Sequence, residues 1–147
     1  GAMGMAGGQG IDLASVGRPL DQPALEHMHA LKTGALLRAA VSMGGLCGPI
    51  DAEVARALTT YGQRVGLAFQ VVDDVLDVLS DTATLGKTAG KDAAANKPTF
   101  VSLLGLDPAK RYADRLIAEA LGALDAAGLA EAHALRALAM HVVARTH

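Results

Sequence analysis

Several residue types and patterns are scarce in this sequence of 147 residues, and each scarcity excludes a class of protein. The single cysteine, Cys47, excludes an internal disulfide and a zinc site built from cysteines. Aromatic residues make up only 3% of the chain and tryptophan is absent, although 51% of the residues are apolar. The apolar content is therefore mostly alanine, leucine and valine, which favours tightly packed helices over a β-sandwich.

The sequence also has neither a large net charge nor a long apolar run. The 13 basic and 15 acidic residues give a net charge of −2, without the basic stripe that a nucleic acid backbone would attract. No run of 18 apolar residues is free of charges, so no membrane span is expected, and the first residues show no leader pattern. We therefore expect a cytoplasmic protein without a nucleic acid partner.

The apolar spacing predicts an all-α protein, a helical bundle without internal repeats. Asp21 and Pro23 begin a helix that glycines end after Met43, and Asp51 caps a second helix that is long enough to be central. The glycines of residues 1–10 suit close backbone approach better than a free-standing helix. Asp107 and Pro108 are expected to cap a later helix. The five helices are predicted at 21–43, 51–80, 98–104, 107–128 and 131–145.

The most informative segment is an acidic cluster in the second helix. Gln70, Asp73, Asp74, Asp77 and Asp81 fall within an arc of about 100° when they are placed on a helix. Like charges at i, i+4 cost about 0.2–0.5 kcal/mol per pair, so a partner should offset the repulsion. Carboxylates that face one cleft match Mg²⁺, which binds one or two carboxylates together with substrate phosphates. A solvated acidic face that only keeps the chain in solution is the alternative.

Lysines on neighbouring segments favour the metal interpretation. Lys87, Lys91 and Lys97 follow the acidic cluster in a polar segment with glycines, and Lys32 precedes it beside small residues. Divalent ions on carboxylates would bind one side of a polyphosphate, and ammonium groups would hold its outer oxygens. Each lysine alone is more simply a solvated surface charge, but together with the acids the set is specific.

These segments together resemble the C-terminal half of the trans-isoprenyl diphosphate synthases, of the bacterial type that makes farnesyl or geranylgeranyl diphosphate. The matching pieces follow one another in the family's order and cover almost the whole chain. The resemblance implies that residues 1–147 form the C-terminal half of an isoprenoid synthase domain. The pieces are GMAGGQGIDL, HALKTGALLRAAV, FQVVDDVLD and SDTATLGKTAGKDAAANKPTFVSLLG.

The resemblance also implies a role for each site residue. Asp73 and Asp77 would bind Mg²⁺, with Asp74 in the same network, and Lys32, Lys87 and Lys97 would hold the diphosphate of the allylic substrate. Thr33 and Gln70 would stabilise the developing allylic cation through oxygen dipoles, and Gln9 would line the same cavity. The implied reaction joins an allylic diphosphate to isopentenyl diphosphate, and the implied assembly is a homodimer. The candidate site residues are Gln9, Lys32, Thr33, Gln70, Asp73, Asp74, Asp77, Lys87 and Lys97.

One part of the family pattern is missing from this sequence. The family has an earlier aspartate-rich motif with an arginine pair after it, whereas Asp73–Asp74 is the one adjacent aspartate pair here and no Arg-Arg occurs. The expectation is therefore half of an active site, inactive or nearly so until the N-terminal half is supplied. Two alternatives stay open, a noncatalytic helical subunit that modulates a partner synthase and a Mg²⁺-dependent diphosphate hydrolase.

Overall fold

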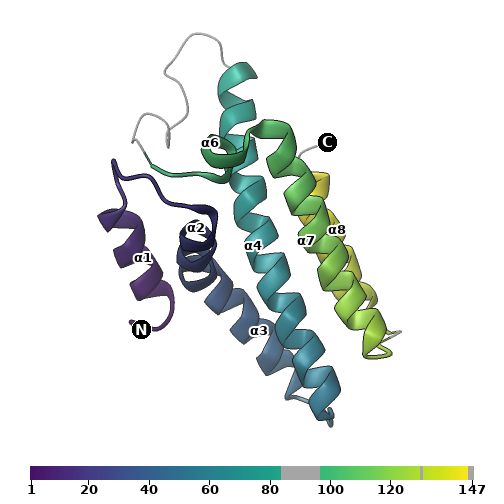
Figure 1. The fold of residues 1–147 in the computed structure, drawn as a ribbon. Helices are drawn as coiled ribbons and strands as arrows, with labels where there is room; N and C mark the ends of the chain where they lie inside the picture. Colours follow the sequence, from purple (N-terminus) through teal and green to yellow (C-terminus); the bar gives the residue numbers. More distant parts are fainter. Residues whose placement is uncertain (84–96, 130, 146–147) are drawn as a thin grey trace.

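The computed structural model of the chain describes residues 1–83, 97–129 and 131–145, and within these ranges it is helical without strands. The 32-residue helix α4 (Ala52–Ala83) runs through the middle of the molecule (Figure 1). Helices α7 (Leu106–Ala126) and α8 (His133–Ala144) pack on one side of α4, and α3 (Ala35–Gly45) packs on the other. The predicted all-α bundle around a long central helix is confirmed for the described residues.

A single helical run extends over residues 22–45 and contains a wide turn. It comprises α2 (Gln22–His29), the π-helical segment η1 (Ala30–Gly34) and α3. Asp21 caps the run, because its carboxylate accepts a hydrogen bond from the backbone of Ala24 at 2.9 Å. The predicted helix, 21–43, is confirmed to within two residues at each end, but the π turn was not predicted. Such turns are frequent at functional sites, and η1 contains Lys32 and Thr33.

Side-chain hydrogen bonds cap the starts of α4 and α6, and one predicted cap is wrong. Asp51 accepts hydrogen bonds from the backbone of Glu53 and Val54 at the start of α4, as predicted. The short helix α6 (Phe100–Leu104) begins at Thr99, which forms a reciprocal capping box with Ser102. Helix α7 begins at Leu106, so Asp107 lies inside its first turn. Gly105, with a φ of 90°, takes the cap position because glycine tolerates that conformation.

The apolar core is formed mainly by α4, α7 and α8, with side chains of α2 and α6, and it includes the valines of the acidic segment. Val71, Val72 and Val75 of α4 are fully buried, which explains why this helix is apolar around most of its circumference. The hydroxyl of Tyr61 in α4 donates to the carbonyl of Leu135 in α8 at 2.7 Å. Burial raises the pKa of Tyr61, so this hydroxyl stays a donor at neutral pH.

The N-terminal glycines lie in a helix, α1 (Met5–Ala14), and this corrects the expectation for residues 1–10. The expected close backbone approach is nevertheless present, because a Cβ atom on Gly8 would lie 2.2 Å from the backbone nitrogen of Lys32. Contact with η1 makes a helix possible in a sequence that is rich in glycine, since packing can override weak helix propensity. Helix α1 therefore lies against η1 with its backbone almost touching.

Apolar side chains are exposed on α1, on α3 and beside them. Leu36 and Leu46 are 71% and 74% exposed, and Leu13 is 64% exposed. Exposed apolar groups of this kind, several on neighbouring elements, are typical of a surface that another polypeptide covers. Among the described helices, none has the combination of length and apolar character that crossing a bilayer requires.

The contact at Gly8 leads to a prediction about stability. Gly8→Ala should lower the free energy of unfolding by about 1–3 kcal/mol, because the added Cβ would push α1 away from η1. Gly10→Ala in the same helix is the matched control, since a Cβ there meets nothing within 4 Å. Alanine at position 10 should be neutral or stabilise by up to about 1 kcal/mol through helix propensity. Urea unfolding of the two variants measures the difference, and equal effects would contradict the contact.

Candidate functional site

Two of the predicted lysines converge on one buried carboxylate. The Nζ atom of Lys32 in η1 lies 2.6 Å from Oδ2 of Asp12 in α1, and the Nζ atom of Lys97 lies 3.5 Å from the same oxygen. Asp12 is 3% exposed. Burial by itself would raise the pKa of Asp12, but the hydrogen bond and charge of Lys32 and the charge of Lys97 outweigh it and the pKa is lowered. Asp12 is therefore ionised. It pairs with Lys97, which lies 85 positions later in the chain.

Asp12 was not among the predicted site residues. It lies in the GMAGGQGIDL segment that carries part of the family resemblance, but a lone aspartate in a helix has no spacing signal of its own. Gln9, which was predicted to line the site, lies one turn before Asp12 on α1 and is half-buried. The pairing of Asp12 with two lysines depends on three elements that are distant in sequence, and only the fold brings them together.

A hydrogen bond joins the predicted threonine and glutamine across two helices. The hydroxyl of Thr33 in η1 donates to Oε1 of Gln70 in α4 at 2.9 Å. Gln70 lies one helical turn before Asp73, so η1 is held beside the start of the acidic segment. Lys32 precedes Thr33, and this bond therefore puts the lysine, the threonine and the glutamine in one region.

The three described aspartates of the acidic cluster have different environments, which corrects the expectation of one common acidic face. Asp73 is exposed and Asp77 is half-buried, whereas Asp74 is only 5% exposed. Oδ2 of Asp74 accepts a hydrogen bond from the backbone of Phe100 at 2.7 Å and so holds the start of α6 against α4. Because neighbouring helical residues differ by 100° in direction, Asp74 turns into the protein while Asp73 turns outward.

The donor set is compatible with Mg²⁺ that shares its coordination with a phosphate ligand. Within residues 1–83, 97–129 and 131–145 no group of three or more His, Cys, Asp or Glu side chains could hold a metal. Mg²⁺ keeps several waters and often takes only one or two carboxylates together with substrate phosphates. The carboxylates of Asp73 and Asp77, one turn apart on α4, are oxygen donors of the kind that Mg²⁺ prefers. Lys87 and Lys91 lie outside the described residues.

A buried histidine lies one turn before the lysine and threonine of η1. His29 is 5% exposed, its ring lies 5.5 Å from that of Phe100, and neither ring nitrogen has a hydrogen-bond partner. Burial, and secondly the charge of Lys32, lower the pKa of His29 from 6.5 to about 4, although Asp12 acts in the opposite direction. The imidazole is therefore neutral at pH 7 and adds no charge to the site.

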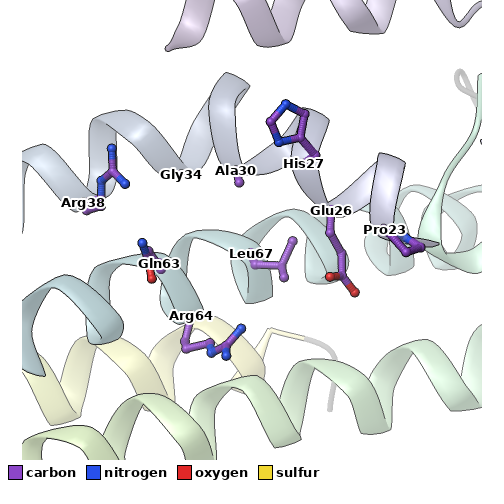
Figure 2. A pocket seen from close by; sticks show the side chains of 9 residues that line it. All are labelled: Pro23, Glu26, His27, Ala30, Gly34, Arg38, Gln63, Arg64 and Leu67. Carbon is purple, nitrogen blue, oxygen red and sulfur yellow. The ribbon is translucent and has the colours of Figure 1, made fainter. Parts of the chain in front are cut away.

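A separate pocket of about 310 Å³ lies between the 22–45 helical run and α4 (Figure 2). None of the predicted site residues lines it. Its Glu26 accepts hydrogen bonds from Gln22 and from the hydroxyl of Tyr112, and its Arg64 pairs with Glu119 of α7 at 2.9 Å. Arg64 has a carboxylate partner of its own in this pocket, whereas at the Asp12 site two lysines share one carboxylate.

The fold is all-helical in the described residues and brings lysines and a carboxylate from distant segments together, and comparison with known proteins identifies the family. A sequence model of the polyprenyl synthetase family matches residues 2–137, so the chain belongs to that family. Farnesyl diphosphate synthase of Escherichia coli K12 is 45% identical over 148 residues and is matched by 99% of this chain. Geranylgeranyl pyrophosphate synthase 3 of Arabidopsis thaliana is 43% identical over 148 residues, again matched by 99% of the chain.

Solved structures agree with this assignment. A geranyltransferase from Helicobacter pylori, complexed with magnesium and isoprenyl diphosphate, is 36% identical and superposes with a TM-score of 0.74 over 99% of this chain and 48% of its own. An FPP/GFPP synthase from Zymomonas mobilis gives a TM-score of 0.77 at 36% identity, over 97% of this chain and 46% of its own. The chain spans 50% of the length of the Escherichia coli relative and 41% of the Arabidopsis one.

The buried histidine leads to a prediction about pH. The unfolded chain takes up a proton at His29 near pH 6.5, whereas the folded chain does so only near pH 4, so the free energy of unfolding should fall as the pH drops between these values. At 1.36 kcal/mol per unit of pKa, the loss should reach roughly 2–4 kcal/mol. His29→Leu should flatten this decline between pH 7.5 and 4.5, above the range in which Asp12 takes up a proton.

Urea unfolding at a series of pH values measures the effect. His27→Leu is the matched control, because His27 lies two residues away in α2 and is exposed. The control should keep the pH dependence of the unsubstituted chain. A decline that persists unchanged in His29→Leu would contradict the neutral, buried state of this imidazole.

Proposed function

We propose that this chain is the C-terminal half of an isoprenoid synthase domain and supplies one wall of a short-chain prenyltransferase active site. The observation that carries the proposal is the Thr33–Gln70 hydrogen bond, because it holds Lys32 beside the turn of α4 that leads into Asp73. The bond thereby holds η1, which carries Lys32, against α4, which carries Asp73. The names of the relatives, farnesyl and geranylgeranyl diphosphate synthases, support a short product.

The proposed substrates are an allylic diphosphate and isopentenyl diphosphate. The ammonium groups of Lys32 and Lys97 would hold the oxygens of the allylic diphosphate, with Lys87 as a further contact. Asp73 and Asp77 would hold Mg²⁺, with Asp74 in the same network. When bound, the metal neutralises charge on the diphosphate and makes it a better leaving group.

The chain's own residues would then guide the carbon chemistry. The C–O bond of the allylic diphosphate breaks, and pyrophosphate leaves with the bonding electron pair. The oxygen atoms of Thr33 and Gln70 would stabilise the allylic cation through their dipoles, while Gln9 lines the cavity. The double bond of isopentenyl diphosphate attacks C1 of the cation, and the proton that is lost passes to the released pyrophosphate.

The complete reaction would require a second polypeptide segment opposite this wall. The exposed leucines of α1 and α3 support a covering segment, as does the fact that the chain spans half of the Escherichia coli relative. A homodimer and a cytoplasmic location stay predictions of the sequence.

The function is tested by complementation. The chain is mixed with the N-terminal half of the Escherichia coli farnesyl diphosphate synthase and incubated with Mg²⁺, geranyl diphosphate and labelled isopentenyl diphosphate. A labelled, elongated diphosphate is expected, and little or none without the added half. Release of inorganic phosphate alone would indicate a hydrolase, and a complex that forms without turnover would favour a noncatalytic subunit.

The metal role is tested in the same assay with Asp73→Ala. Turnover should fall at least about tenfold, since even indirect disturbance of a metal's ligands costs that much. Asp114→Ala, which removes an exposed carboxylate from α7, is the control and should retain full turnover. Equal activity of the two variants would count against Asp73 as a magnesium ligand.

A further inference from the structure

We propose, building on the function proposed above, that Asp12 is a positioning residue for the diphosphate-binding lysines. Its carboxylate holds the ammonium groups of Lys32 and Lys97 together in the absence of substrate, and the diphosphate then binds to a pair of cations that is already ordered. Helix α1, which carries Asp12, lies beside the 22–45 helical run (Figure 1).

The distances support this role. Both lysines approach the same oxygen, Oδ2 of Asp12, at 2.6 and 3.5 Å. One negative charge thus lies between two positive charges, and the group of three keeps a net charge of +1 that attracts an anion. Each ammonium group has three N–H donors, so contact with Asp12 leaves donors for phosphate oxygens.

The two lysine side chains are more exposed to solvent than the carboxylate that they share. The side chain of Asp12 is 5% exposed, whereas those of Lys32 and Lys97 are 31% and 30% exposed. An anion that arrives from solvent therefore meets the ammonium groups, and the carboxylate lies beneath them. Lysine side chains lose considerable rotamer freedom when they are fixed, and a carboxylate that fixes them beforehand reduces the entropy lost on binding.

Two explanations predict opposite effects of removing the Asp12 carboxylate on pyrophosphate binding. Asp12→Asn raises the local positive charge by one, so electrostatic attraction alone would strengthen pyrophosphate binding. If Asp12 acts by ordering the lysines, the same substitution weakens binding, because the two ammonium groups repel each other and separate. The sign of the change therefore distinguishes the two explanations.

The experiment measures binding of inorganic pyrophosphate with Mg²⁺ to the 147-residue chain by isothermal titration calorimetry. Asp12→Asn should raise the Kd about tenfold, because two flexible lysine side chains must then be immobilised on binding. In a chain that carries Lys32→Gln and Lys97→Gln, adding Asp12→Asn should change the Kd less than twofold. Asp114→Asn on α7 removes an exposed carboxylate and should leave the Kd unchanged.

A second variant keeps the proposal testable if Asp12→Asn fails to fold, as judged by circular dichroism. Asp12→Glu keeps the charge but moves the carboxylate by one methylene group, and it should also weaken binding. Unchanged or tighter binding by the folded variants would overturn the proposal, as would an equal effect of Asp12→Asn in the chain without the two lysines. If the unsubstituted chain binds no pyrophosphate, this inference is overturned, whereas the proposed function is decided separately by the complementation assay.

Discussion

The close contact between α1 and η1 at Gly8 determines where the charged groups of this protein can lie. With the two backbones almost touching, the carboxylate of Asp12 reaches Lys32 at 2.6 Å. A larger side chain at position 8 would separate the helices and leave Asp12 buried without its cation, which is costly in an apolar environment. The electrostatics of the site thus depend on a steric condition, the absence of one Cβ atom.

Two hydrogen bonds fix the segments around this contact to the central helix α4. Thr33 binds Gln70, so η1 is fixed against α4, and Asp74 binds the backbone of Phe100, so α6 is fixed against the next turn of the same helix. Lys97 lies three residues before Phe100, and it also approaches Asp12. Helix α4 therefore connects the two segments whose lysines meet at one carboxylate.

Much of the fold could be predicted because its signals are local. Asp21 and Asp51 cap helices, and the valines around residue 72 follow helical spacing, so both the elements and the buried face were evident. The π turn and Asp12 could not be predicted, since both depend on contacts between distant segments. Asp74 was grouped with Asp73 by its sequence position, yet burial separates them. The roles of the site residues stay predictions, and Lys87 lies outside the described residues.

The wide turn η1 has a consequence for how this chain can change in length during evolution. Loss of one residue from α2 or α3 would rotate the part of the helix on one side of the deletion by about 100° relative to the other part. A side chain on the rotated part would then point in another direction. Met28, which is 1% exposed, would turn away from the core, or Leu36, which is 71% exposed, would turn away from its present direction. A deletion inside η1 is the exception, because the π turn holds one more residue than an α turn and could close to an α turn with the flanking helices kept in register.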